Sequence, residues 1–71
     1  MNYSQYLQKV ADAYKDPKNA DLRLGQLYIN VLAECGYNVL VALIIGTDLD
    51  PFYTDENLER FCKWVELKLK D

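Results

Sequence analysis

Three aspartates in the second half of the chain are the side chains best suited to holding a metal ion. Asp48, Asp50 and Asp55 lie close together in the sequence, and carboxylate oxygens are ligands that Ca²⁺ and Mg²⁺ prefer. The spacing differs from that of an EF-hand, because Phe52 occupies the third ligand position and the loop glycine is missing. Helix caps and turns account for the same aspartates more simply. We therefore predict no metal site and no cofactor, and keep a metal or small ligand at residues 48–55 as an alternative.

The chain lacks the residue types on which most catalytic sites depend. It contains no histidine, which is the commonest general base. Its only serine, Ser4, has no base beside it in the sequence. A nucleophilic cysteine needs a positive neighbourhood, whereas Cys35 follows Glu34 and Cys62 falls on the apolar side of a predicted helix. We therefore predict no catalytic residue and expect that the protein is not an enzyme.

A polar stripe runs along the second predicted helix. Arg23, Gln26 and Asn30 are spaced i, i+3 and i+7, which places them on one helix face. The stripe could contact a ligand or partner, or it could form an internal hydrogen-bond network. In the internal network, Arg23 would pair with Asp48 or Asp50, and Asn30 would bond to backbone. We favour the internal network, because polar groups in a folded chain usually find partners within the protein.

Gly25 lies inside the same predicted helix, where glycine costs about 1 kcal/mol relative to alanine. We interpret it as a position of close packing, with another helix or an aromatic residue such as Phe52 lying against it. The substitution Gly25→Ala should then destabilise the protein despite the better helix propensity of alanine.

Charge is distributed unevenly along this chain of net charge −3. Between Arg23 and Arg60 there is no basic residue but there are six acidic ones. The chain therefore lacks the strong basic footprint that nucleic-acid binding requires, and a protein is the expected partner. Exposed tyrosines, here beside turns and near an acidic loop, are often used by protein-binding surfaces. The residues that we expect to form such a surface are Tyr37, Asp48, Asp50, Tyr53, Asp55, Glu56 and Glu59.

The length and composition favour one folded domain over residues 1–71. Apolar residues make up 51% of the chain, and they include six tyrosines, two phenylalanines and one tryptophan. A core of this size is marginal, so a homodimer that buries more surface remains an open alternative. We find no signal peptide, and the longest apolar run, residues 39–45, is far shorter than the roughly 20 residues of a membrane span. We expect a cytoplasmic protein with reduced cysteines and no membrane contact.

Apolar residues recur at the helical period through most of the chain. The pattern predicts helices over residues 2–15, 21–35 and 55–70. A turn at residues 16–19 separates the first helix from the second. Asp21 is the expected N-cap of the second helix, with Asn19 as a competitor, and Gly36 is its expected C-cap. Thr54 or Asp55 should cap the last helix, whose expected core face is Leu58, Phe61, Cys62, Val65 and Leu69.

Residues 39–45 have no polar break, so periodicity does not distinguish a buried helix from a buried strand. A strand would need a partner, which only a second copy of the chain could supply. We therefore favour a short, almost fully buried helix that ends at Gly46. Asp50 followed by Pro51 favours a short helical turn at residues 50–53. The predicted fold is all-α, a compact bundle of three to four helices.

Two sequence patterns resemble those of a known group. Residues 23–32 fit R-x-G-Q-x-x-x-N-x-L, and residues 46–53 with 61–65 fit G-T-x-x-D-P-F-Y followed by F-x-x-W-V. Together they resemble a group of small uncharacterised proteins encoded by bacteria and their phages. The resemblance covers residues 23–65 and implies a helical fold and a bacterial or phage origin, with no assigned activity.

These observations lead to a function hypothesis without catalysis. The leading interpretation is a small protein-interaction module, a bacterial or phage accessory or inhibitor protein that acts by binding another protein. One alternative is a structural component that self-assembles through residues 39–45. The other is a small-ligand or metal binder that uses the aspartates of residues 48–55.

Overall fold

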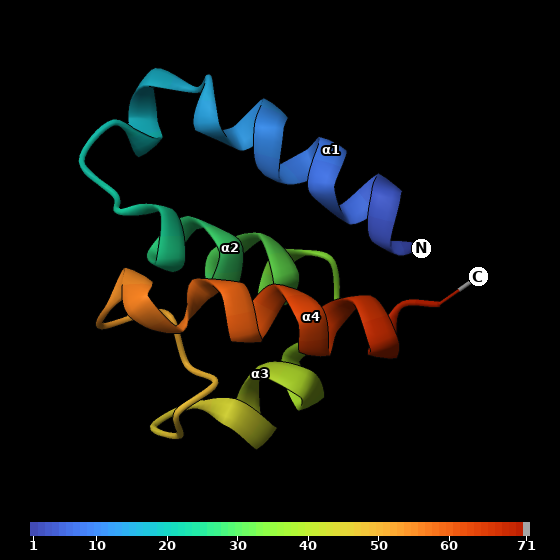
Figure 1. Cartoon of the computed structure of the whole chain (residues 1–71). Coiled ribbons are helices and arrows are strands. Elements are labelled where there is room, and N and C mark those ends of the chain that lie inside the picture. The colour runs from blue at the N-terminus through green and yellow to red at the C-terminus, as the bar shows by residue number, and fades with distance from the viewer. Residues whose placement is uncertain (71) are drawn as a thin grey trace.

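In the computed structural model, residues 1–70 are described and contain helices but no β-strand (Figure 1). The prediction of an all-α bundle is thereby confirmed, with 67% of the described residues in α- or 3₁₀-helices. The helices are α1 (Tyr3–Tyr14), α2 (Leu24–Glu34), α3 (Asn38–Ile44) and α4 (Leu58–Lys68), with 3₁₀ turns η1 (Pro17–Asn19) and η2 (Asp55–Asn57). None of the described helices is long and apolar enough to cross a bilayer.

Local sequence signals set both ends of α1. Asn2 and Gln5 form a reciprocal capping box, in which each side chain accepts a hydrogen bond from the other residue's backbone N–H at 2.8–2.9 Å. The helix ends before Pro17, and the Asp16 carboxylate accepts a hydrogen bond from the Lys18 N–H at 3.1 Å to begin η1. The predicted helix and the turn that follows it are both present.

Helix α2 begins at Leu24, three residues later than predicted. The turn after η1 continues through a hydrogen bond from the Leu22 N–H to the Asn19 carbonyl, 3.0 Å long, so Asp21 belongs to that turn and is not an N-cap. The helix ends as predicted at Gly36, whose φ of 93° lies in the left-handed region. This conformation lets the chain reverse directly into α3.

Most of the segment of residues 39–45 forms a short helix, α3, as expected. The prediction that this helix is almost fully buried is wrong. Only Ile44 is buried, whereas Val39 and Leu43 are 75% and 63% exposed. A helix of two turns can direct only one face into the core. Because Val39 and Leu43 are four residues apart, they share the opposite face. Gly46 ends the helix with a φ of 80°.

The helical turn predicted at residues 50–53 is also wrong, since the chain there bends without forming a helix. The Asp50 carboxylate accepts hydrogen bonds from the backbone N–H groups of Gly46 and Phe52 and holds the segment in a turn. The helical turn lies further along, at η2, where Thr54 caps it by accepting a hydrogen bond from the Glu56 N–H at 3.3 Å. Helix α4 follows directly.

The core lies where α1, α2 and α4 meet. The Tyr28 ring packs edge-on against Tyr6 and Phe61, at centroid distances of 6.1 and 6.4 Å. The Tyr6 hydroxyl donates a hydrogen bond to the Tyr28 carbonyl at 2.6 Å. The two ends of the described chain lie together (Figure 1), joined by a 3.1 Å hydrogen bond from the Tyr3 N–H to the Leu69 carbonyl. The buried apolar residues are Tyr6, Val10, Leu27, Ile29, Val31, Leu32, Ile44, Phe61, Val65 and Leu69.

Candidate functional site

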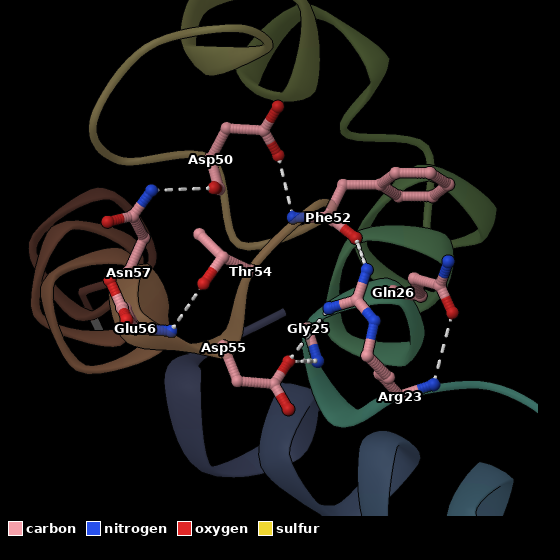
Figure 2. Close-up of polar contacts among 9 residues, drawn as sticks. All are labelled: Arg23, Gly25, Gln26, Asp50, Phe52, Thr54, Asp55, Glu56 and Asn57. Carbon is pink, nitrogen blue, oxygen red and sulfur yellow. Dashed lines mark hydrogen bonds and ion pairs between the residues drawn. The ribbon is translucent and has the colours of Figure 1, made fainter.

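The Asp50 carboxylate points into the protein and binds its own loop. Asp50 is only 3% exposed to solvent. One carboxylate oxygen accepts a hydrogen bond from the Gly46 N–H and the other from the Phe52 N–H, both at 2.8 Å. The Asp50 carbonyl accepts a further hydrogen bond from the Asn57 side chain at 2.9 Å (Figure 2). Asp50 therefore holds the loop together and is not part of the exposed surface.

Asp55 connects the loop to the N-terminus of α2. Its Oδ1 accepts a hydrogen bond from the Gly25 N–H at 3.0 Å and lies 3.2 Å from Nη1 of Arg23 (Figure 2). The first N–H groups of a helix lack partners within the helix and attract negative charge. A carboxylate thirty residues away in sequence therefore caps α2, where a local cap was predicted.

Arg23 has an internal role, but with a different partner from the one predicted. It pairs with Asp55, not with Asp48 or Asp50. Its second guanidinium nitrogen donates a hydrogen bond to the Phe52 carbonyl (Figure 2). Arg23 thus holds both the beginning of η2 and the backbone that precedes it against α2.

Gly25 is a position of close packing, as predicted, but the neighbour is backbone and not the Phe52 ring. A Cβ atom added to Gly25 would overlap the Pro51 carbonyl oxygen and lie 2.9 Å from Oδ1 of Asp55. Because Pro51 is fully buried, its carbonyl has little room to move. Only glycine lets residues 50–55 lie this close to α2.

The polar stripe does not form one network. The Gln26 side chain accepts a hydrogen bond from the Arg23 N–H at 3.0 Å, across the first turn of α2. Asn30 lies elsewhere, beside a shallow hollow between α1, η1 and α2 whose lining includes Asp12 and Glu34. The hydrogen bonds found among residues 1–70 include none from the Asn30 side chain, so the backbone bond predicted for it is absent.

The other residues of the predicted partner-binding surface are mostly exposed. Asp48 pairs with Arg60 at 3.8 Å, and Glu59 pairs with Lys63 at 3.4 Å, all through exposed side chains. Surface ion pairs of this kind contribute little to stability. Glu56 is exposed, and Tyr53 is 76% exposed with its ring edge-on to Phe52. Tyr37 is half-buried against the core.

The side chains that could ligate a metal ion are dispersed over the described residues. Across residues 1–70, no three histidine, cysteine or acidic side chains converge on a common point. Burial raises the pKa of the Cys62 thiol, and a hydrogen bond with Tyr3 offsets this only in part. Burial likewise raises the pKa of Tyr3, Tyr6 and Tyr28. At neutral pH these groups stay protonated, and protonated groups are poor nucleophiles and bases.

The structure also has two exposed apolar surfaces, although residues 39–45 were expected to be almost fully buried. One is the outer face of α3, formed by Val39, Ala42 and Leu43, with Ile45 just beyond the helix at 48% exposure. We call it the α3 face. The only signal for it in the sequence is the i, i+3, i+4 spacing, which an uninterrupted apolar run conceals.

The second apolar surface is a groove between α1 and the beginning of α2, with a volume of about 420 Å³. We call it the α1–α2 groove. Tyr14 and Leu24 in its lining are 66% and 42% exposed. The lining residues are Leu7, Val10, Ala11, Tyr14, Lys15, Leu24 and Tyr28.

No protein-family model matches the chain, and no curated protein and no solved structure is significantly similar to it. The function must therefore be argued from the exposed surfaces and from the internal contacts that remove residues from them.

Proposed function

We propose that this protein is a non-enzymatic interaction module that binds another protein through the α3 face. The observation that carries the proposal is the exposure of Val39 and Leu43 on the outer side of a short helix. Burying a valine or leucine side chain contributes about 1.5–3 kcal/mol relative to leaving it in water. A partner that covers both side chains would gain a large part of this free energy.

The composition around α3 supports the same proposal. Helices on protein surfaces normally present polar residues to solvent, but residues 35–47 contain no charged side chain in a chain that is 27% charged. Contiguous exposed apolar side chains bordered by polar ones are typical of interaction sites. Asp48 and Glu56 lie in the segment that follows and supply exposed acidic groups.

The geometry of α3 favours a particular mode of binding. Val39, Ala42 and Leu43 have the i, i+3, i+4 spacing with which an amphipathic helix fills an apolar groove on its partner. Exposed acidic residues in the next segment favour basic residues at the rim of that groove. We place this protein in the cytoplasm as an accessory or inhibitor protein of bacterial or phage origin. The free thiols of Cys35 and Cys62 and the resemblance of the sequence patterns support that placement.

The test is affinity capture from bacterial lysate with matched variants. Leu43→Glu places a charge on the α3 face, and Leu67→Glu places the same charge at a leucine of equal exposure on α4, 65% against 63%. We expect wild type and Leu67→Glu to retain the same protein and Leu43→Glu to retain at least tenfold less. Unchanged melting temperatures of both variants would show that folding is intact. Equal capture by all three forms, or none above background, would contradict the proposal.

A further inference from the structure

Helix α3 contributes less to the core than any other helix of the bundle. It has one buried residue, Ile44, whereas α1 and α4 each have two and α2 has five. Among the other helices, α3 packs mainly against α2, and it lies on the opposite side of the molecule from α1 (Figure 1). Segments with few buried apolar contacts are the ones that open locally while the rest of a protein stays folded.

Polar side chains do not hold the segment that contains α3 in place. Across the described chain, no side-chain hydrogen bond or ion pair joins residues 37–45 to α1, α2 or α4. A backbone hydrogen bond from the Tyr37 N–H to the Leu32 carbonyl, 3.2 Å long, ties the beginning of the segment to α2. The Val41 and Ile45 N–H groups bond to carbonyls within the segment itself, so these hydrogen bonds would persist if the segment moved as a whole.

Two glycines with left-handed backbone bound this segment. The φ angle is 93° at Gly36 and 80° at Gly46, and no other described residue has a positive φ. Hinges are a few residues at the ends of elements that absorb large backbone rotations. Glycine does so at low steric cost, because it has no Cβ atom. Both ends of the segment therefore carry a residue that can act as a hinge.

The chain beyond each glycine is held firmly by the rest of the protein. On the side of Gly36, the segment follows α2, which has the most buried residues of any helix. On the side of Gly46, the buried Asp50 carboxylate accepts a hydrogen bond from the Gly46 N–H, and Arg23 donates one to the Phe52 carbonyl. The two ends of the segment are thus fixed, while the residues between them have few ties.

We propose that residues 37–45 form a flap that opens as one unit at Gly36 and Gly46 while the other helices stay folded. Opening exposes Ile44 and uncovers the side of α2 on which the flap packs. The open form therefore presents more apolar surface than the closed form, and a ligand that binds the open form increases its population. This inference concerns the motion of α3 and holds whether or not a partner binds the α3 face.

Hydrogen exchange of the backbone amides, followed by NMR at urea concentrations below the unfolding transition, tests the inference. We expect the amides of Val41 and Ile45 to exchange at least about tenfold faster than the slowest amides of α2 and α4. Their rates should rise together with urea, but with a smaller slope than those of α2 and α4, because partial opening exposes less surface. Rates independent of urea would show only fraying of a short helix, and a slope equal to that of α2 and α4 would show unfolding of the whole protein. Either result overturns the inference.

Two substitutions of buried residues separate opening of the flap from unfolding of the whole chain. Ile44→Ala removes a contact that opening breaks, so it should accelerate exchange of the flap amides by at least about tenfold. Val10→Ala removes a contact on α1 that the open form keeps. It should accelerate the slowest α2 and α4 amides by at least about fivefold and leave the flap amides within about twofold of wild type.

Equal acceleration of the flap amides by the two substitutions would show that the flap opens only when the whole protein unfolds, and would overturn the inference. If either variant does not fold, Ile44→Val and Tyr6→Phe form a milder matched pair. Tyr6→Phe removes only the hydrogen bond to the Tyr28 carbonyl, which joins α1 to α2 away from the flap. The same contrast between flap amides and core amides is expected for this pair, with smaller changes.

Discussion

The loop of residues 46–57 and the helix α3 that precedes it direct their side chains in opposite ways. In the loop, Asp50 and Asp55 point towards backbone N–H groups of their own chain. In α3, Val39 and Leu43 point towards solvent. Two aspartates of the loop are therefore committed to internal contacts, whereas α3 leaves apolar side chains exposed to solvent.

The difference follows from how each segment satisfies its backbone. A helix pairs most of its own N–H and C=O groups, so α3 needs the core on only one face. A loop packed against the core has no such ladder, and its backbone groups need side-chain partners. Acidic residues in a packed loop are thus poor indicators of a binding surface. Four substitutions can test this difference between the loop and α3.

Among the four test substitutions, Gly25→Ala should have the largest effect, a loss of about 3 kcal/mol in the free energy of unfolding. The new Cβ would overlap the Pro51 carbonyl, and overpacking against buried backbone costs about 1–3 kcal/mol or more. Urea denaturation measures the change. Gly36→Ala is the control, because it has open space but a positive φ and should lose only about 1–2 kcal/mol. A stabilised Gly25→Ala protein would show that the loop does not pack on α2.

Asp50→Ala should cost about 2 kcal/mol, since it leaves the N–H groups of Gly46 and Phe52 without their acceptor. In a chain of this size the melting temperature would fall by about 10 °C. The matched control is Asp48→Ala, whose carboxylate is exposed and should contribute less than about 0.5 kcal/mol. Equal effects of the two substitutions would mean that the two aspartates are equivalent and that our comparison is mistaken.

Asp55→Ala should cost about 1 kcal/mol, because it removes a cap of α2 and an ion pair whose partly exposed side chains are screened by solvent. A double-mutant cycle with Arg23→Ala isolates the pair. We expect a coupling free energy of at least about 0.5 kcal/mol. Additive effects of the two substitutions would indicate that Arg23 acts only through the Phe52 carbonyl.

Leu43→Ala should have the smallest effect, within about 0.5 kcal/mol, because the side chain is already mostly in water. The neighbouring Ile44→Ala should cost about 2–4 kcal/mol, since Ile44 is 2% exposed. Thermal denaturation of dilute samples gives both values without contributions from association. Similar losses for the two variants would show that both faces of α3 are buried.

Much of the local structure could be predicted from the sequence. The limits of α1, the turn at Pro17 and the end of α2 at Gly36 all follow from nearby residues. The close packing at Gly25 could be inferred from the cost of glycine in a helix, but its neighbour could not. The beginning of α2 was misplaced because its cap, Asp55, comes from a distant part of the chain.

By itself, the sequence determined the three longer helices, the ends of α1, the end of α2 and the lack of histidine, because these depend on residue types and short-range spacing. Only the tertiary structure decided which side of α3 faces solvent, since an uninterrupted apolar run contains no polar residue to mark an outer face. It also decided that Arg23 pairs with Asp55 and that Pro51 lies on Gly25. Those contacts depend on the path of the loop between α3 and α4, which brings distant residues together.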